Sequence, residues 1–521
     1  MPFQQYKPTL SLMPTLVGFA VVSTIYIFFC AANDIFDMAG DASGYLLAAQ
    51  YFSPFQPSTQ MLQAYSSEII YPPLFSLIVG ALGGSALAAS LTVVASLLGA
   101  FLALYSWLRA ENLGSIASSA TVLLFALMPI TYVTALNIWT ENTYLFFSLM
   151  AVFAVSHAET DQEPRHYWLA AAVAVALAAL TRVAAAPLVA AFCLYLAIKR
   201  PTGYLRFIAV AVLPFCIWAI IAKSKQIGLG GYTSQWSAFY QDDAVRVLLE
   251  NMSGWVRALV FSWKVGFVGD VAGTPLPAIV GFVGVLGLVG WASRLRYLKF
   301  DALYVMCYMA MLLAWPHPEE SSRYGYVMAP FLITYAVLFL DNCAEKIKRV
   351  AYFSPVFIML SICLAMVIPS LLVNIQRYRM SVAEDLKDAR KMEGWYSDDG
   401  ASTEYLTPLR LKIIVHLKSV AGRVPESDCI FSVKPTVVSI HTGRSSFAPP
   451  LNTADDAEFE KGLQRCRYAY VIGLAFSNRP RLYPLGRLHD RAHIVSQVSM
   501  GNGLNTHLIG ALVEIMPKQS D

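Results

Sequence analysis

Residues 85–108 read SALAASLTVVASLLGAFLALYSWL and contain no Asp, Glu, Lys, Arg or His. About 20 apolar residues in a helix suffice to cross the hydrocarbon core of a bilayer, which is about 30 Å thick. This run therefore predicts a membrane-spanning helix. Ten further runs are also predominantly apolar and lie at 11–31, 115–136, 142–158, 166–181, 183–198, 205–222, 276–293, 302–316, 325–341 and 352–375. The sequence thus predicts a polytopic α-helical membrane protein with about eleven transmembrane helices.

Charge is distributed unevenly along the chain. Only 14% of the 521 residues are charged, whereas about 25% is usual for a soluble domain. Residues 1–376 hold 37 of the 72 Asp, Glu, Lys and Arg residues, and residues 377–521 hold the other 35. This composition excludes an ordinary soluble enzyme. It predicts a membrane domain over 1–376 and a soluble domain over 377–521.

Lysine and arginine indicate the orientation of the membrane domain, because they accumulate in cytoplasmic loops. With the N-terminus inside, the clear basic clusters between helices all fall on the cytoplasmic side: Arg109, Arg165, Lys199, Arg200, Arg206, Arg294, Arg296, Lys299, Lys346, Lys348 and Arg349. Residues 33–84, in contrast, contain four carboxylates and no Lys or Arg. We therefore predict that the first loop, 33–84, is exoplasmic, as is a second, long loop at 223–273.

Eleven crossings also place the C-terminal domain on the exoplasmic side. Arg377 and Arg379, directly after the last span, favour the opposite side, but the earlier loops dominate the rule. The domain contains Cys429 and Cys466, which are able to form a disulfide if it faces an oxidising compartment.

The C-terminal domain has the sequence pattern of a small α/β domain. Short apolar runs at 429–433, 437–440 and 468–474 alternate with turn residues and suggest strands. Residues 404–420 predict an amphipathic helix.

Composition and cysteine spacing exclude two kinds of partner. The net charge of +4 is small for a chain of this length and gives no contiguous basic surface, so nucleic acid is not expected as a partner. The eight cysteines show no Cys-x-x-Cys or Cys/His spacing, which argues against a structural zinc site.

The membrane domain places its unusual polar residues on the exoplasmic side. Besides the acids of the first loop, Glu141 begins a span, Arg182 separates two short apolar helices, and Arg323 and Tyr324 follow another exoplasmic turn. Ionisable groups at membrane depth are costly and usually face a cavity, although those at helix ends also extend to water. We predict that these residues converge on one site.

The first loop itself predicts two short helices. The alanines, Tyr45 and Leu46 that follow Asp41 suit a helix with Asp41 near its N-terminus. Pro72 and Pro73 suit the start of another helix near the membrane surface.

The order of these residues resembles the GT-C superfamily of polytopic glycosyltransferases. The resemblance is closest to the branch that contains the lipid A aminoarabinose transferase and the protein O-mannosyltransferases. The matching features extend over 33–345: Asp41 with Tyr45, Tyr71-Pro72-Pro73-Leu74, Glu141 at a helix start, Thr181-Arg182, and Arg323-Tyr324 shortly before Pro330. A looser match in the C-terminal domain is Ile440-His441-Thr442-Gly443-Arg444.

The resemblance implies transfer of a sugar from a polyprenyl-phosphate carrier to an exoplasmic glycolipid, polysaccharide or protein, with inversion at the anomeric carbon. Such a transfer needs a base for the acceptor hydroxyl and cations for the leaving phosphate. By resemblance Asp41 is the base. Asp37, Glu68 and Glu141 are secondary acidic residues that bind the acceptor or tune the base, and Tyr45, Tyr71, Pro72 and Pro73 form the structural motif.

Arg182 and Arg323, together with Tyr324, are the candidates for binding the donor phosphate. A guanidinium matches phosphate oxygens in bidentate fashion and stays charged. The alternative for both arginines is a helix-end side chain that extends to the membrane surface.

Two departures from the superfamily pattern limit the expected chemistry. Ala42, not a second acid, follows Asp41, and the membrane part contains no Asp-x-Asp, so we expect no divalent metal and no other cofactor. The C-terminal domain lacks a Trp-Trp-Asp motif, so transfer of an assembled glycan to Asn is not expected.

A rival hypothesis from another class is a proton-coupled transporter or lipid flippase, and a third is a non-catalytic membrane scaffold. Transporters often show paired repeats with broken helices at the midplane. Here the polar residues gather at one face and about 145 further residues follow the membrane domain, which favours the transferase. We expect it in a bacterial cytoplasmic membrane, surrounded by membrane lipids, with its active site on the periplasmic face.

Overall fold

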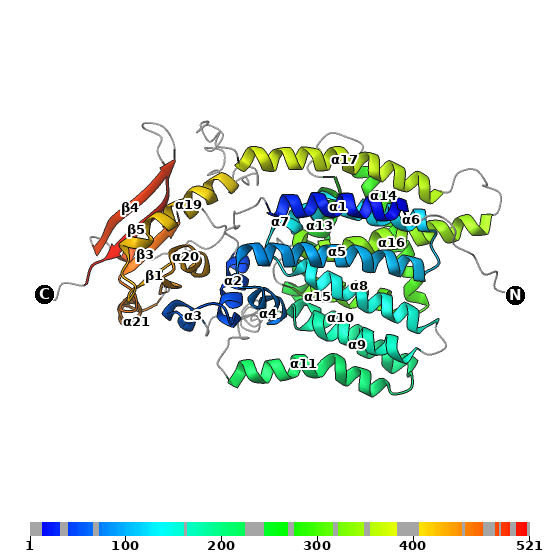
Figure 1. Cartoon of the computed structure of the whole chain (residues 1–521), viewed down its shortest axis with the longest axis horizontal. Coiled ribbons are helices and arrows are strands. Elements are labelled where there is room, and N and C mark those ends of the chain that lie inside the picture. The colour runs from blue at the N-terminus through cyan, green and yellow to red at the C-terminus, as the bar shows by residue number, and fades with distance from the viewer. Residues whose placement is uncertain are drawn as a thin grey trace.

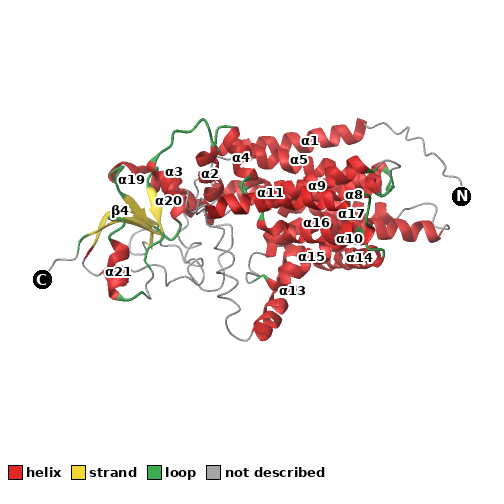
Figure 2. Ribbon diagram, turned by 90° about the horizontal axis from the view of Figure 1, so that it is seen from below, coloured by secondary structure: helices red, strands yellow, loops and turns green. Residues whose placement is uncertain are grey.

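A computed structural model of the chain describes residues 13–31, 40–65, 72–160, 164–224, 244–268, 276–315, 321–347, 355–382, 406–450, 454–472, 485–488, 491–500 and 507–517. A bundle of helices forms the larger part of the molecule, and a small sheet with its own helices lies at one end of the bundle (Figure 1). Figure 2 shows that the strands are confined to this end.

Every apolar run in the sequence overlaps a helix or a bent pair of helices in the described part of the chain. The bundle helices are α1 (Met13–Ala31), α5 (Ala86–Ala110), α6 (Ser115–Leu127), α7 (Pro129–Leu136), α8 (Glu141–Ala158), α9 (Arg165–Ala179), α10 (Ala186–Lys199), α11 (Tyr204–Ser224), α14 (Leu276–Arg296), α15 (Phe300–Ala314), α16 (Ser321–Ile347) and α17 (Pro355–Val382). α6 and α7 are bent by 59° relative to each other. The bend follows from Pro129, because the residue before a proline is disfavoured in a helix, and Met128 is accordingly extended.

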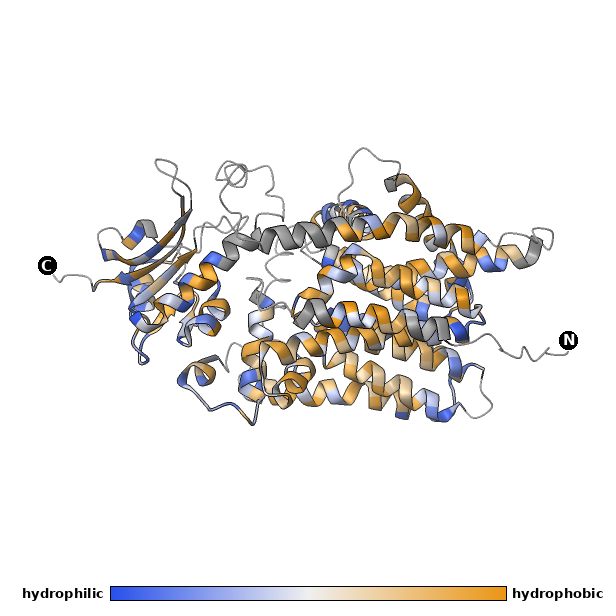
Figure 3. Cartoon of the chain, turned by 45° about the horizontal axis from the view of Figure 1, so that its top comes forward, coloured by the Kyte–Doolittle hydropathy of each residue, from blue (hydrophilic) through white to orange (hydrophobic). Residues whose placement is uncertain are grey.

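Four of the described helices are long and apolar enough to cross a membrane by themselves, namely Ala86–Ala110, Tyr204–Ser224, Ala278–Arg296 and Arg323–Ala344. The bent pair α6 and α7 makes a fifth candidate, and shorter apolar helices accompany them. Apolar residues dominate the bundle, and hydrophilic residues gather near its helix ends (Figure 3). The chain is an integral membrane protein. The structure supports four or five of the expected crossings, and the full count of about eleven stays a prediction.

Charged side chains join the helix ends at the face predicted to be cytoplasmic. Arg294 Nη1 donates to Glu111 Oε2 at 2.8 Å, and Lys299 Nζ donates to Glu159 Oε2 at 2.6 Å. Glu159 directly follows α8, whereas Glu141 begins it. The 18 residues of α8 span about 27 Å, close to the hydrocarbon thickness of a bilayer. The basic cluster and the candidate site therefore lie at opposite faces.

Three short helices form the described part of the first loop: α2 (Gly40–Phe52), α3 (Gln60–Tyr65) and α4 (Leu74–Ala81). Asp41 is the second residue of α2, and Pro73 directly precedes α4. Both helix starts predicted from the sequence are therefore confirmed.

The segment 223–273, expected as a loop, contains a 25-residue helix, α13 (Ala244–Val268). The helix packs against α14, α15 and α16. Asn251 Nδ2 and Trp255 Nε1 both donate to the carbonyl oxygen of Trp315, at 2.7 and 2.6 Å. Asn251 and Trp255 are four residues apart and therefore lie on the same face of α13. The charged residues of α13 are the reason why its sequence does not resemble a membrane span.

The C-terminal part is a five-stranded mixed sheet in the order β2-β1-β3-β5-β4. Its strands are β1 (Cys429–Phe431), β2 (Ser445–Phe447), β3 (Tyr468–Ile472), β4 (Ala492–Met500) and β5 (His507–Ile515). β1 pairs in parallel with β2 and β3, whereas β5 is antiparallel to β3 and β4. Two of its core clusters include helices: one contains α19 (Leu406–Val420) and α20 (Pro435–Thr442), and the other contains α21 (Asp456–Leu463).

The positions of α19, β1 and β3 are as predicted, but the strand expected at 437–440 is wrong. These residues belong to α20. Pro435 is preorganised for the first turn of a helix. Gly443, with φ of +67°, ends the helix in the left-handed conformation that glycine tolerates. The hairpin of β4 and β5 is a further element that the sequence analysis missed.

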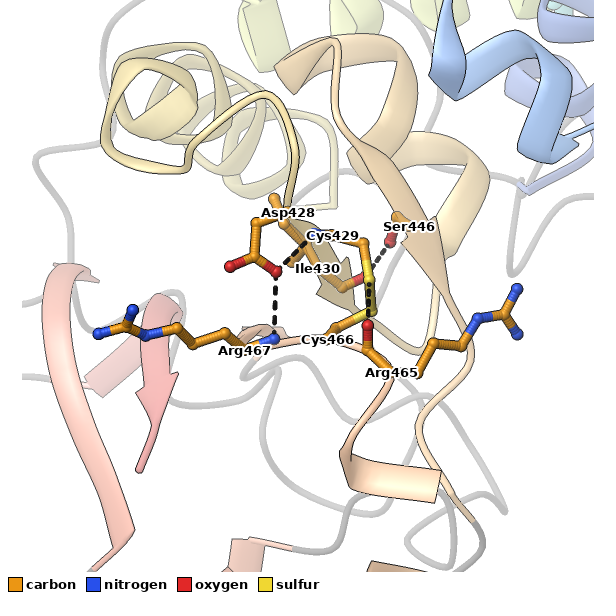
Figure 4. Close-up of a disulfide and its surroundings, with 7 residues drawn as sticks. All are labelled: Asp428, Cys429, Ile430, Ser446, Arg465, Cys466 and Arg467. Atoms are coloured by element: carbon orange, nitrogen blue, oxygen red, sulfur yellow. Dashed lines mark hydrogen bonds between the residues drawn. A yellow bond between two sulfur atoms is a disulfide. The ribbon is translucent and has the colours of Figure 1, made fainter. Parts of the chain in front are cut away.

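Cys429 and Cys466 form a disulfide with a Cα–Cα distance of 4.9 Å (Figure 4). The bond joins the first residue of β1 to the chain just before β3, so it ties two neighbouring strands together. Structural disulfides persist in oxidising compartments. The bond therefore agrees with the exoplasmic placement of this domain.

The sheet domain packs on the helices of the first loop. α20 contacts α2, and β2 contacts α3. Ser43 Oγ and Thr436 Oγ1 lie 3.0 Å apart in a hydrogen bond between α2 and α20. Ile440 packs against the apolar side chains of α2. Since Ser43 is two residues from Asp41, the domain borders the candidate site.

Candidate functional site

Asp41 lies in the first turn of α2, where a carboxylate is favoured by the helix dipole. Residues 42–49, which follow it, are all buried and fix the helix against its neighbours. The Asp41 side chain itself keeps 35% of its surface exposed. It is thus a carboxylate on a rigid support that a second molecule is able to reach.

Glu141 is the first residue of α8, and its side chain is completely buried. Its Oε1 atom forms ion pairs with Nη1 of Arg182 and with Nε of Arg323. Its Oε2 atom has no hydrogen-bond partner among the residues that the structure describes. Glu141 is therefore the point at which the two candidate arginines meet.

Arg182 lies in an extended backbone segment between α9 and the short 3₁₀ helix Val183–Ala185. This is the break between two short helices that the sequence predicted. The Arg182 side chain is 9% exposed, and its guanidinium carbon lies 5.4 Å from the ring centroid of Tyr324. A cation over an aromatic ring is attracted by the ring's quadrupole. Tyr324 thus contacts Arg182 and helps to hold it.

Arg323 is the third residue of α16 and connects the acidic residues of two other helices. Its Nη1 atom donates to Asp41 Oδ2, and its Nε atom donates to Glu141 Oε1. Its guanidinium carbon lies 4.9 Å from the ring centroid of Trp139. Arg323 therefore joins α2 and α8 through one planar group.

Tyr45 secures the same three-helix junction. Its hydroxyl group and Thr140 Oγ1 are 3.1 Å apart in a hydrogen bond between α2 and the start of α8. Ser76 Oγ, on α4, donates to the backbone carbonyl of Tyr45 at 3.1 Å. Pro72 and Pro73 are buried at the start of α4. These contacts agree with a structural role for the tyrosine and the two prolines.

The cluster combines two guanidinium groups with two carboxylates, and only Asp41 is substantially exposed. Buried charges are tolerated when they are paired and hydrogen-bonded. Such an arrangement has two chemical uses: the arginines are able to bind an anion, and the exposed carboxylate is able to accept a proton. These are the two functions that a sugar phosphate transfer requires.

Three predicted site residues cannot be placed, and two residues of the cluster were not predicted. Asp37, Glu68 and Tyr71 lie outside the described residues. Trp139 and Thr140 are parts of the cluster that the sequence analysis did not select, although both directly precede Glu141. Within the described part of the chain, no group of three or more His, Cys, Asp or Glu side chains is placed to hold a metal ion.

Comparison with known proteins gives one family match along the sequence. A family model described as dolichyl-phosphate-mannose-protein mannosyltransferase matches residues 71–222. The matched segment includes Glu141 and Arg182. No curated protein sequence matches the chain.

The fold is similar to that of ArnT from Cupriavidus metallidurans in the apo state, with a TM-score of 0.52 at 11% sequence identity. The match covers 96% of this chain and 98% of that chain. The family match and the shared fold together support the resemblance to the GT-C superfamily. ArnT bound to undecaprenyl phosphate is also similar in fold, with a TM-score of 0.52, 12% identity, and coverage of 97% of this chain and 98% of that chain.

A further match is the archaeal oligosaccharyltransferase AglB from Archaeoglobus fulgidus in complex with an inhibitory peptide and a dolichol-phosphate. It has a TM-score of 0.49 and 13% identity, and covers 88% of this chain and 69% of that chain.

Proposed function

We propose that this protein transfers a sugar from a polyprenyl-phosphate donor to an acceptor on the exoplasmic side of the membrane. The observation that carries the proposal is the cluster of Arg182 and Arg323 beside the partly exposed Asp41. The mannosyltransferase family match and the fold shared with ArnT, one structure of which holds undecaprenyl phosphate, support a lipid-linked donor.

In the proposed reaction, Asp41 takes the proton of an acceptor hydroxyl group while the oxygen of that hydroxyl group attacks the anomeric carbon of the sugar. The bond between that carbon and the phosphate oxygen breaks, and its electron pair leaves with the polyprenyl phosphate. Attack and departure on opposite sides of the carbon invert its configuration. The proton is held by Asp41 until it passes to solvent, which the exposed part of its side chain reaches.

Arg182 and Arg323 are proposed to bind the phosphate and to stabilise its departure. The donor is a phosphate diester, whereas the leaving polyprenyl phosphate is a monoester and carries more negative charge. Guanidinium groups held in place before the reaction stabilise this additional charge more in the transition state than in the donor. Their burial strengthens the effect, because charge interactions are stronger away from water.

The acceptor is proposed to approach from the exoplasmic face, next to the sheet domain that packs on α2. Glycolipid, polysaccharide and protein acceptors all present a hydroxyl group to Asp41 there. We place this face in the periplasm of a bacterial cytoplasmic membrane. The disulfide between Cys429 and Cys466 supports an oxidising compartment on this side.

We propose that transfer requires no divalent metal, because two arginines supply the positive charge at the phosphate. The expected result is unchanged turnover after treatment with EDTA. Loss of turnover with EDTA and recovery with added Mg²⁺ or Mn²⁺ would contradict this part of the proposal.

The donor class is tested by incubating purified protein with a panel of polyprenyl-phosphate sugars and measuring thermal stabilisation. A ligand that binds only the folded protein raises the unfolding temperature. We expect stabilisation by at least one member in the wild type and a loss of it in Arg182→Ala and Arg323→Ala. If no polyprenyl-phosphate sugar stabilises the wild type, the proposed donor class is wrong.

The same purified protein also tests the rival transporter or flippase. Reconstituted in vesicles, a flippase moves the intact lipid-linked sugar across the bilayer, whereas a transferase releases free polyprenyl phosphate and a glycosylated acceptor. Translocation without cleavage of the sugar phosphate would replace the proposed function by the rival one.

A further inference from the structure

We propose that Arg323 exchanges Asp41 for the donor phosphate, so that binding of the lipid phosphate releases the base. The inference rests on the proposed function. It adds an order of events: the donor binds first, and the acceptor hydroxyl is deprotonated only once the donor is in place.

The first step of the argument is that Arg323 is engaged on two sides. Nε faces the buried Glu141, and Nη1 faces Asp41. Both atoms belong to one planar guanidinium group. A guanidinium binds a phosphate in bidentate fashion through Nη2 together with either Nε or Nη1. Each of these two edges includes a nitrogen that already donates to a carboxylate, so the phosphate competes with Glu141 at one edge and with Asp41 at the other.

The second step concerns which carboxylate yields. Glu141 is fully buried and also pairs with Arg182, whereas Asp41 is 35% exposed and pairs with Arg323 at the edge of the cluster. Ion pairs near water are weaker than buried ones, because solvent screens them. Removing a partner from a buried pair also leaves an uncompensated charge. The phosphate therefore displaces Asp41 and leaves the pair with Glu141 intact.

The third step links the exchange to catalysis. While Arg323 donates to Asp41 Oδ2, that oxygen is occupied by a cation. Once the guanidinium turns to the phosphate, Arg323 no longer occupies Oδ2 of Asp41 or neutralises its negative charge, and this oxygen is able to accept the proton of the acceptor hydroxyl. Glu141 and Trp139 keep the guanidinium in position during the exchange. The device ties activation of the base to the presence of a donor.

The test is a double-mutant cycle on binding of undecaprenyl phosphate in detergent micelles, without sugar and without acceptor. Asp41→Asn removes the competing carboxylate charge at constant size, so it should lower the dissociation constant by about fivefold. In an Arg323→Gln background, where there is no guanidinium to compete for, the same substitution should change the constant by less than about twofold. That difference is the signature of exchange at Arg323.

Equal tightening in both backgrounds would overturn the proposal, because Asp41 would then act on the phosphate through long-range charge alone. An unchanged constant for Asp41→Asn would overturn it as well. If Arg323→Gln does not yield folded protein, Arg323→Lys replaces it. A single ammonium cannot hold two partners in the same planar geometry, so the effect of Asp41→Asn should be smaller there than in the wild type.

A matched control comes from the opposite face of the bundle. Asp301 Oδ2 accepts a hydrogen bond from Arg294 Nε at 2.7 Å, so it is also an aspartate bound to an arginine. Asp301→Asn should leave the dissociation constant unchanged. The binding measurement also separates this inference from the proposed function. If the wild-type protein does not bind undecaprenyl phosphate, the proposed function is refuted. If it binds, but Asp41→Asn has the same effect with and without Arg323, only the exchange is refuted.

Discussion

At the scale of single residues, the burial of Glu141 contradicts one of the two roles expected of it. As a secondary acid it was expected to bind the acceptor or tune the base. The structure buries its side chain completely between Arg182 and Arg323. A carboxylate in this position has no exposed surface for an acceptor and instead neutralises two buried cations.

We expect Glu141→Gln to destabilise the protein markedly, because it leaves two buried guanidinium groups near each other without their shared counter-charge. Breaking a buried pair costs about 3–5 kcal/mol. Asp41→Asn, which removes a partly exposed partner of Arg323, should cost about 1 kcal/mol or less. Thermal unfolding of both variants in detergent checks the order. A Glu141→Gln protein as stable as Asp41→Asn would show that the buried carboxylate is not needed to hold the arginines.

The residue types of the cluster were predictable from the sequence, but their pairing was not. Asp41, Glu141, Arg182 and Arg323 are conspicuous because ionisable residues are rare in apolar segments. Arg323 and Asp41, however, are 282 positions apart. Only the packing of α2, α8 and α16 decides which acid each arginine meets. Trp139 was missed because an aromatic residue at a membrane surface is common and has no signal of its own.

At the scale of elements, the close approach of α14 to α16 depends on glycine. A Cβ atom at Gly290 would lie 2.3 Å from the carbonyl oxygen of Tyr335, and one at Gly287 would lie 2.6 Å from that of Leu332. Small residues allow such contact between helix backbones in membranes, where van der Waals packing is a main source of helix association.

We expect Gly290→Ala to lower stability by about 1–3 kcal/mol, because the added methyl group forces the two helices apart. Gly281→Ala is the matched control on the same helix, since a Cβ atom there has no other atom within 4 Å. Unfolding temperatures of the two variants in detergent are compared with the wild type. Equal unfolding temperatures for the two variants would contradict the packing of α14 on α16.

The predictability of the elements follows from their physical signals. Long apolar runs correctly located the bundle helices, because a helix in lipid needs little beyond length and hydrophobicity. Short elements in the C-terminal domain were harder. Residues 437–440 are β-branched or small and suggest a strand, yet Pro435 and Gly443 delimit a helix. α13 was missed because its apolar residues alternate with charged ones and no single run reaches the length of a span.

At the scale of the whole molecule, the distribution of charge defines two faces. Glu111, Arg294 and Lys299 gather at one face, whereas Asp41, Glu141 and Arg323 gather at the other. The sheet domain packs on the second face. The uneven composition of the chain allowed the sequence to predict a membrane part and a soluble part. It did not predict that the soluble part would contact α2 within two residues of Asp41.

The predicted exoplasmic placement of the sheet domain has a consequence for the redox state of its cysteines. We expect Cys429 and Cys466 to resist alkylation in the unfolded, unreduced protein and to be modified after reduction, because they form a disulfide that an oxidising compartment preserves. Cys193, Cys216, Cys307, Cys343 and Cys363 serve as internal controls, since they should be modified without reduction. Mass spectrometry of protein purified from membranes measures both. Free thiols at positions 429 and 466 would contradict the exoplasmic placement.

The central claim is that Asp41 is the base of a sugar transfer from a polyprenyl-phosphate donor. The most direct measurement compares the release of polyprenyl phosphate and the glycosylation of acceptor by the wild type and by Asp41→Asn, using the donor that the stabilisation panel identifies. Removal of a general base typically lowers the rate by about 10²- to 10⁴-fold. We predict a loss of kcat of this size in Asp41→Asn, with donor binding at least as tight as in the wild type. Turnover of Asp41→Asn at the wild-type rate would contradict the account.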